Sequence, residues 1–218
     1  MTNNWRKGTN CIQGGYTPNS GEPRVLPIYQ SATYKYDDPD KLEALFNLEA
    51  DGHLYTRISN PTLSALEEKF SKLEGGVGAV ATASGQSAIL LSILNICKAG
   101  DHIISVSSLY GGTVNLFNVH LKNLKVAREN TKAVYGETIG NPGLNVLDFE
   151  KFAKVASKLE VPFIVDNTVG TPYLINPFKF GANVVVHSTT KYSEGHAQSI
   201  GGIIVDGGNF NWSNNKFP

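Results

Sequence analysis

Short apolar runs that alternate with amphipathic helical segments constrain the fold of this chain more than any other feature of its sequence. Apolar runs of strand length occupy residues 77–81, 102–106, 133–136, 162–165, 184–187 and 201–205. Helical periodicity occupies residues 86–98, 113–123 and 147–159 between those runs. This order predicts an α/β fold, in which helices cover both faces of a mostly parallel sheet. Because ligands of such folds bind beyond the carboxyl ends of the strands, we expect a site at that edge.

The amino-terminal part of the chain lacks sustained periodicity. Its prolines are Pro18, Pro23, Pro27 and Pro39. Only residues 42–48 indicate a short helix there, so we predict an extended arm over residues 1–60 and a large domain over residues 61–218. The domain begins with a helix at Pro61, because Asn60 suits an N-cap and proline suits a first helical turn. Gly75-Gly76 is expected to end this helix.

Two intervals do not fit a complete domain. Between the helix ending near Asn123 and the strand starting near Ala133 there is room only for a loop, although the alternation calls for a further strand or helix. The segment from Asn209 to Pro218 is polar and rich in asparagine, and it follows a strand without closing a domain. We therefore expect an incomplete domain, with residues missing after Asn123 and after Pro218.

Charge and cysteine usage argue against several classes of function. The chain has 19 Lys and Arg against 19 Asp and Glu, which gives no reason to expect a nucleic acid or an anionic membrane as partner. Cys11 and Cys97 are far apart and have no partner at zinc-ligand spacing, which argues against a disulfide scaffold or a metal site. We find no secretory signal and no apolar run long enough to span a bilayer, and expect a cytoplasmic protein.

The first candidate for ligand binding is Ser84-Gly85-Gln86, which follows an apolar strand and begins a helix. Free backbone N–H groups and the positive end of the helix favour a phosphate at such a place. The alternative is a turn of small residues that lets strand and helix pack closely, since glycine is common in tight turns. A nucleotide P-loop does not fit, because its Gly-Lys-Ser/Thr is missing at the required spacing.

Two more candidates follow the runs at 161–165 and 183–187. Asp166 ends the first run and could keep a pyridine nitrogen protonated, although an aspartate at a strand end is more often a turn former. Lys191 follows a cluster of hydroxyl side chains, Ser188 to Thr190, after the second run. An isolated lysine is usually a solvated surface residue, because lysine is seldom buried.

Two segments supply further groups for a phosphorylated, flat ligand. Tyr55 and Arg57 carry a phenol and a guanidinium, which suit phosphate oxygens, and the alternative for Arg57 is an ordinary surface role. Tyr110 lies in a glycine-containing loop after a strand. Its ring could stack on a cofactor or pack into the core, and the residues alone do not decide between the two.

Taken together and in order, these segments resemble the Cys/Met-metabolism family of pyridoxal-5′-phosphate (PLP) enzymes. The motifs are YTRISNPT (55–62), SGQSAI (84–89), SLYGGT (108–113), ETIGNPG (137–143), VDNT (165–168) and HSTTKY (187–192). Their order and spacing match over nearly the whole chain, which outweighs the alternative given for each one alone. Within the family, residues 27–36 and 44–62 are most similar to the O-acetylhomoserine sulfhydrylases.

The resemblance implies PLP as cofactor and the PLP-dependent transferase fold, which is aspartate aminotransferase-like (fold type I). It makes Lys191, Tyr110 and Asp166 the catalytic groups: Lys191 carries PLP as a Schiff base, Asp166 pairs with the pyridinium nitrogen and Tyr110 stacks on the ring. The other residues that it places around PLP are Gly85 and Gln86 (N–H groups to the phosphate), Ser188 and Thr190 (hydroxyls to the phosphate), Asn141 (beside the 3-hydroxyl), and Tyr55 and Arg57 (to the phosphate of a neighbouring subunit). The family's smaller C-terminal domain, with the arginine for the substrate carboxylate, is not among these 218 residues.

The activity that the resemblance implies is a γ-replacement, in which O-acetyl-L-homoserine and sulfide give L-homocysteine and acetate during methionine and cysteine biosynthesis. It also implies a homotetramer whose active sites are shared between subunits. The same cofactor shell would serve a methionine or cystathionine γ-lyase or a cystathionine γ-synthase. A catalytically silent assembly subunit with a PLP fold is the alternative from another class, and the presence of both Lys191 and Asp166 weighs against it.

Overall fold

The computed structural model describes residues 5–120 and 129–217. The chain divides into two compact units, Met1–Lys69 and Phe70–Pro218, and the boundary falls within helix α3 (Pro61–Glu74). The predicted division into an arm over residues 1–60 and a large domain over residues 61–218 stays a prediction.

The first unit contains α1 (Lys7–Gln13), α2 (Pro39–Phe46) and the first part of α3. Helix α2 confirms the short helix expected near residues 42–48, and it begins where the Asp38 side chain accepts a hydrogen bond from the Asp40 N–H at 3.0 Å. Helix α1 was not predicted, because the sequence analysis expected an extended arm with a single short helix at residues 42–48. This helix has no side-chain cap and buries no residue, so it lacks the apolar periodicity by which a sequence shows a helix.

Helix α3 begins and ends as its sequence predicts. The Asn60 side-chain oxygen accepts a hydrogen bond from the Thr62 N–H at 2.8 Å, which satisfies one of the free donors of the first turn. Gly75 follows the last helical residue with φ +79°, a left-handed conformation that glycine adopts without steric cost.

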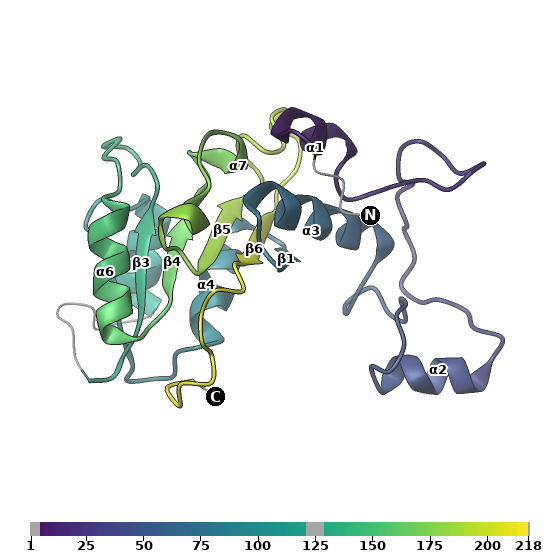
Figure 1. Cartoon of the computed structure of the whole chain (residues 1–218), viewed down its shortest axis with the longest axis horizontal. Coiled ribbons are helices and arrows are strands. Elements are labelled where there is room, and N and C mark those ends of the chain that lie inside the picture. The colour runs from purple at the N-terminus through teal and green to yellow at the C-terminus, as the bar shows by residue number, and fades with distance from the viewer. Residues whose placement is uncertain (1–4, 121–128, 218) are drawn as a thin grey trace. The chain divides into compact units, whose positions relative to one another are not determined.

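The second unit is built on one six-stranded sheet (Figure 1). The strands are β1 (Gly78–Thr82), β2 (His102–Ser105), β3 (Thr131–Glu137), β4 (Phe163–Asp166), β5 (Val184–Ser188) and β6 (Gly202–Asp206). Their order is β1-β6-β5-β4-β3-β2, in which β2, β3, β4 and β5 run parallel to one another and β6 runs antiparallel to both β1 and β5. The predicted mostly parallel sheet is therefore confirmed, with β6 as the reversed strand.

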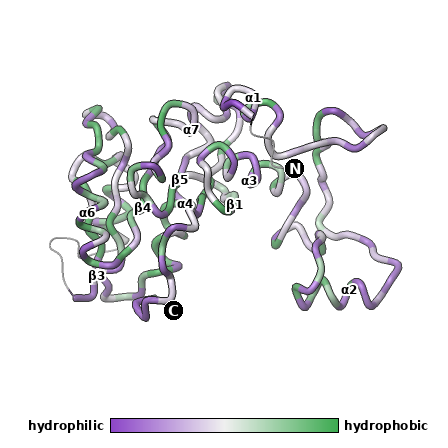
Figure 2. Tube along the Cα trace, viewed as in Figure 1, coloured by the Kyte–Doolittle hydropathy of each residue, from purple (hydrophilic) through white to green (hydrophobic). Residues whose placement is uncertain are grey.

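Alternate strand residues point to opposite sides of this sheet, so apolar side chains lie on both of its faces. Helices cover both faces. Helix α4 (Gly85–Leu94) packs Ile89 and Ile93 in one core cluster with Ile164 and Val186. On the opposite face, Phe163 contacts the rings of Phe149 and Phe152 of α6 (Phe149–Leu159). Figure 2 shows hydrophilic and hydrophobic colours alternating along α6, as expected for a helix with one buried side.

The remaining helices are short, and two predicted helix boundaries are corrected. They are α5 (Gly111–Asn115), the π-helix η1 (Leu116–His120), α7 (Thr171–Leu174) and the 3₁₀ turn η2 (Pro177–Phe180). The helix predicted over 86–98 ends at Leu94, because Asn95 caps it and the next residues form tighter turns. The helix predicted over 113–123 is α5 followed by η1, and its end near Asn123 lies outside the described residues.

The interval in which a strand or helix was expected includes residues 121–128, which also lie outside the described residues. Strand β2 pairs directly with β3, so no strand lies between these two in the sheet.

The carboxyl-terminal stretch differs from the predicted polar segment. The rings of Phe210, Trp212 and Phe217 pack edge to face at centroid distances of 4.7 to 5.6 Å, and Trp212 and Phe217 pack against the core. The asparagine-rich composition of this stretch indicated a polar segment. The aromatic contacts were not predicted, because they depend on the turn that brings the three rings together.

Candidate active site

The carboxyl ends of three parallel strands bring the predicted site residues of the second unit to one edge of the sheet. Glu137 at the end of β3 is the register partner of Asp166 at the end of β4. Asp166 is in turn the partner of Val186 on β5, two residues before Ser188. The chain segment that contains Lys191 therefore leaves the sheet beside the strand that ends in Asp166.

The amino terminus of α4 reaches the same edge. A Cβ atom on Gly85 would lie 2.5 Å from the Cβ and 2.8 Å from the Cα of Ser188, so only glycine fits this contact. Ser84 caps the helix by accepting a hydrogen bond from the Ser87 N–H at 3.1 Å. This leaves the first N–H groups of the helix, on Gly85 and Gln86, without helical partners. The structure thus brings together the two segments predicted to hold a phosphate.

Asp166 is partly buried and is held by the loop that follows it. Its Oδ1 accepts a hydrogen bond from the Thr168 N–H at 2.8 Å, while the Thr168 hydroxyl accepts one from the Ser188 N–H at 2.8 Å. Burial raises the pKa of this carboxyl, whereas the hydrogen bonds from Thr168, the charge of His187 and a contact with Tyr135 lower it. Asp166 is thus an oriented acceptor, connected through Thr168 to the phosphate-binding candidates.

Lys191 lies in the turn after β5 and its side chain is exposed. Its N–H donates a hydrogen bond to the Ser188 carbonyl at 3.4 Å. The hydroxyl of Thr190 bonds to the backbone of Gly201, accepting from its N–H at 3.0 Å and donating to its carbonyl at 3.2 Å. A contact of Thr190 with a phosphate therefore requires its hydroxyl proton to turn away from Gly201.

Tyr110 and Asn141 come from the loops after β2 and β3, and both side chains are exposed. The Tyr110 ring, 47% exposed, lies over the start of α5, where a Cβ on Gly112 would lie 2.6 Å from the ring and 3.2 Å from the Gln86 amide. Tyr110 is therefore near the phosphate-binding candidates, with a ring surface available to a ligand.

Glu137 is a site residue that the sequence analysis missed. It is 6% exposed, and its Oε1 accepts a hydrogen bond from the Tyr110 N–H at 2.8 Å. Burial raises the pKa of Glu137 to about 7, the Tyr110 N–H opposes this shift, and the charge of Asp166 adds to it. A signal was present in the sequence, because Glu137 ends its apolar run in the way that Asp166 ends the next one.

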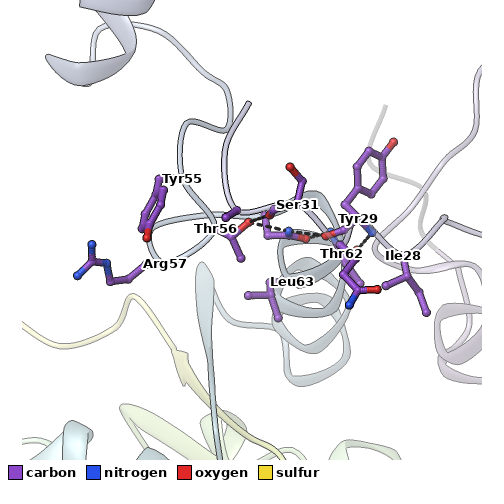
Figure 3. A pocket seen from close by; sticks show the side chains of 11 residues that line it. Ile28, Tyr29, Ser31, Tyr55, Thr56, Arg57, Thr62 and Leu63 are labelled. Carbon is purple, nitrogen blue, oxygen red and sulfur yellow. Dashed lines mark hydrogen bonds between the residues drawn. The ribbon is translucent and has the colours of Figure 1, made fainter. Parts of the chain in front are cut away.

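Tyr55 and Arg57 belong to the first unit. The Arg57 guanidinium lies 5.1 Å from the centre of the Tyr55 ring. Both line a cavity of about 560 Å³, together with Ile28 to Ala32, Thr56, Asn60, Thr62 and Leu63. Figure 3 shows Tyr55 and Arg57 at one side of this group. The structure does not relate these two residues to the edge of the sheet.

Comparison with known proteins identifies the family. The family model of the Cys/Met metabolism PLP-dependent enzymes matches residues 8–217. The chain belongs to this family. PLP is the cofactor of the family by its description, so the predicted cofactor and the predicted family are both confirmed.

Curated members of the family are similar over most of the chain. The chain is 46% identical to an O-acetyl-L-homoserine sulfhydrylase of Leptospira meyeri, over 100% of this chain and 53% of that protein. It is 44% identical to a homocysteine/cysteine synthase of Saccharomyces cerevisiae, over 92% of this chain and 49% of that protein. The chain therefore spans about half the length of these relatives. The first alignment has 234 positions for a chain of 218 residues, so that relative carries residues that this chain lacks.

A solved structure in the family supports the expected fold. It is that of a candidate O-acetylhomoserine (thiol)-lyase of Campylobacter jejuni, 34% identical, with a TM-score of 0.88 over 93% of this chain and 54% of that one. That protein contains a pyridoxyl-lysine monophosphate residue. The aspartate aminotransferase-like fold of PLP-dependent transferases is thereby confirmed for this chain.

The residues at the edge of the sheet fit PLP. The Gly85–Ser188 contact leaves a helix start and hydroxyl groups for a phosphate, while Asp166 offers a carboxylate and Tyr110 a ring face. Within residues 5–120 and 129–217, no group of three or more His, Cys, Asp or Glu could hold a metal ion. No helix of the described residues is long and apolar enough to cross a membrane. The individual roles of the site residues stay predictions.

Proposed function

We propose that the complete protein converts O-acetyl-L-homoserine and sulfide to L-homocysteine and acetate by PLP-dependent γ-replacement. The observation that carries this proposal is the convergence of Gly85, Asp166 and the Ser188–Lys191 segment at one edge of the sheet. The sulfhydrylase and homocysteine synthase names of the relatives support the choice of substrate. Because the chain spans about half of those relatives, the activity is proposed for the whole protein.

The residues at this edge divide the work of holding the cofactor. Lys191 would bind PLP covalently through its amine, and the N–H groups of Gly85 and Gln86 with the hydroxyls of Ser188 and Thr190 would bind its phosphate. Tyr110 would stack on the ring. Asn141 would lie beside the 3-hydroxyl of PLP. Tyr55 and Arg57 would bind the phosphate of the PLP in a neighbouring subunit.

When bound, PLP supplies a ring that accepts the electron pair released at the substrate's Cα. Asp166 would keep a proton on the ring nitrogen, which makes the ring a better acceptor. The Lys191 amine, once displaced by the substrate amine, would take the proton from Cα and carry it within the site as a general base and acid. In the proposed reaction, loss of a second proton from Cβ would allow acetate to leave the γ-carbon, and sulfide would take the place of the acetate there.

Sister activities use the same cofactor shell. A methionine or cystathionine γ-lyase or a cystathionine γ-synthase would need the same groups around PLP, and groups that recognise the second substrate would distinguish them. A catalytically silent assembly subunit is the alternative from another class. The conjunction of Lys191 and Asp166 at one edge favours an enzyme, because an assembly role requires neither.

A substrate assay tests this assignment. We expect the complete protein to form homocysteine and acetate from O-acetylhomoserine and sulfide faster than it forms cystathionine from O-acetylhomoserine and cysteine. Sulfide is small and needs few contacts, whereas cysteine requires partners for its amine and its carboxylate. The products are quantified in parallel with methionine supplied alone. Faster formation of cystathionine, or faster cleavage of methionine, would move the assignment to the corresponding sister activity.

We also propose a homotetramer with shared active sites, supported by the placement of Tyr55 and Arg57 in a unit separate from Lys191. Mixing inactive Arg57→Ala subunits with inactive Lys191→Ala subunits is expected to restore part of the activity, because some sites then receive both intact residues. Activity is measured after mixed oligomers have been verified by mass. Mixed oligomers as inactive as either parent would contradict the sharing of sites.

A cytoplasmic location is part of the same proposal. Cys11 and Cys97 are both free thiols, as expected in a reducing compartment. Detection of the protein in a membrane or secreted fraction would contradict it.

A further inference from the structure

The segment that presents Lys191 is a loop that is closed at its base. This Lys191 loop (residues 189–201) follows Ser188, the last residue of β5, and leads into β6 at Gly202. At its base, the Thr190 hydroxyl accepts a hydrogen bond from the Gly201 N–H at 3.0 Å and donates one to the Gly201 carbonyl at 3.2 Å. Because the two ends are fixed to each other, the residues between them decide where the Lys191 amine can reach.

The backbone of Glu194 closes the turn that contains Lys191. The Glu194 N–H donates a hydrogen bond to the Thr189 carbonyl at 3.0 Å, and the Gly195 N–H donates one to the Lys191 carbonyl at 3.0 Å. On its other side, the Lys191 N–H donates to the Ser188 carbonyl at 3.4 Å. The backbone of Lys191 is therefore held at both its N–H and its carbonyl.

The Glu194 carboxylate binds the returning half of the same loop. Its Oε2 accepts hydrogen bonds from the His196 N–H at 2.9 Å and from the Gln198 N–H at 3.1 Å. Ala197, between these two donors, has a φ of 57°, a left-handed conformation that costs free energy for any residue with a Cβ atom. A left-handed residue of this kind is typical of a nest, in which successive N–H groups converge on one anion. The hydrogen bonds to the carboxylate therefore offset the cost of this conformation.

We propose that Glu194 is a positioning residue that holds the Lys191 loop in the conformation from which the Lys191 amine reaches the cofactor. The proposal rests on the proposed function, because it requires Lys191 to carry PLP. Glu194 touches neither cofactor nor substrate in this role. It acts through the backbone, since its main chain fixes the turn around Lys191 and its side chain fixes the half of the loop that returns to β6.

An ordered loop matters because the Lys191 side chain is long and exposed. Fixing a lysine side chain costs conformational entropy, and a loose backbone beneath it would add to that cost when PLP attaches. Glu194 lowers the cost by ordering the loop before PLP arrives, which is the advantage of a preorganised group. The effect should appear in the attachment of PLP and in kcat, where the Lys191 amine moves a proton. It should not appear in the KM for sulfide.

The test compares Glu194→Ala with Glu194→Gln in the complete protein, freed of PLP. PLP is then added, samples are reduced with borohydride at intervals, and the label on Lys191 is quantified by peptide mapping. We expect Glu194→Ala to lower the rate of labelling about tenfold, because hydrogen bonds to a charged acceptor are lost. Glu194→Gln should retain most of the wild-type rate, because its amide oxygen still accepts hydrogen bonds from the two N–H groups.

Limited proteolysis of the protein without PLP measures the order of the Lys191 loop directly. Glu194→Ala should be cleaved within residues 189–201 faster than wild type, while its melting temperature changes little because Lys191 and its neighbours are exposed. A matched control is Asp206→Ala. The Asp206 Oδ1 also accepts a backbone hydrogen bond, from the Gly208 N–H at 2.9 Å, but Asp206 pairs with Val184 at the opposite edge of the sheet. The control should keep the wild-type rate of labelling.

Three results would overturn the proposal. The first is a wild-type rate of labelling in Glu194→Ala. The second is an equal loss in Glu194→Gln and Glu194→Ala, because it would assign the effect to the negative charge instead of the hydrogen bonds. The third is an equal slowing by Asp206→Ala. Failure of the wild-type protein to take up PLP, or a label on another lysine, would instead refute the proposed function, and with it the role of Glu194.

Discussion

Replacing Lys191 with alanine is expected to abolish covalent attachment of PLP and to lower kcat of the complete protein by more than about 100-fold. The variant loses two roles at once, since the same amine would fix the cofactor and move the substrate proton. General acid–base catalysis by one residue typically contributes about 10²- to 10⁴-fold by itself. The loss of structure should be small, because the Lys191 side chain is exposed in the turn after β5.

Borohydride reduction followed by peptide mapping measures the attachment directly. Reduction fixes the cofactor on the lysine that holds it, and the labelled peptide should contain Lys191. Lys179→Ala is a suitable control, because Lys179 is another exposed lysine of the same unit, in η2. It should retain both label and activity. A phosphopyridoxyl label on any lysine other than Lys191 would refute the assignment, whatever the activity of the variant.

Glu137→Gln is expected to stabilise the apo protein at pH 8 while changing its stability little at pH 5. Burial raises the pKa of Glu137 to about 7 from an ordinary value of 4.5. Between these values the folded chain keeps a proton that the unfolded chain has released, so the free energy of unfolding falls as pH rises through this window. The loss is complete above the folded pKa. It amounts to about 2–3 kcal/mol after allowance for solvent screening.

Glutamine has no charge to titrate, and its amide oxygen can still accept the hydrogen bond from the Tyr110 N–H. Denaturant unfolding at pH 5 and pH 8 measures the effect as the difference between the two free energies of unfolding. Glu150→Gln is the control, because Glu150 is an exposed glutamate on α6 and should change stability by less than about 0.5 kcal/mol. An equal pH dependence in wild type and Glu137→Gln would show that Glu137 titrates normally in the folded chain.

Asp166 and Glu137 are two carboxylates at one edge of the sheet for which we expect different tasks. Asp166 is proposed to work as an anion, whereas a neutral Glu137 keeps the Tyr110 loop in place without adding a second charge nearby. Their different settings explain the difference. Burial raises the pKa of both carboxyls, but at Asp166 the Thr168 hydrogen bonds and the charge of His187 oppose this shift, whereas at Glu137 the adjacent charge of Asp166 adds to it.

Local sequence signals predicted the helix ends and the strands, which depend on residues that are near one another in the sequence. The start of α3 follows from Asn60 and Pro61, and its end follows from Gly75, because caps and left-handed turns involve only neighbouring residues. Apolar runs predicted all six strands of the sheet to within a few residues. Helix α1 and the aromatic packing of Phe210, Trp212 and Phe217 were not predicted, since neither has the periodicity of a buried face.

The sequence by itself determined which residues end their strands, and through ordered motifs it determined the family and the cofactor. It placed Asp166, Ser188 and Lys191 after strands, where a parallel sheet collects its ligands. Only the tertiary structure decided which strand ends are neighbours, and therefore that Glu137 lies in register with Asp166. Only the tertiary structure joined Glu74 to His187, 113 positions apart. The physical reason is that burial and pairing of charges depend on groups brought together across the chain, and the order of residues contains no direct signal for either.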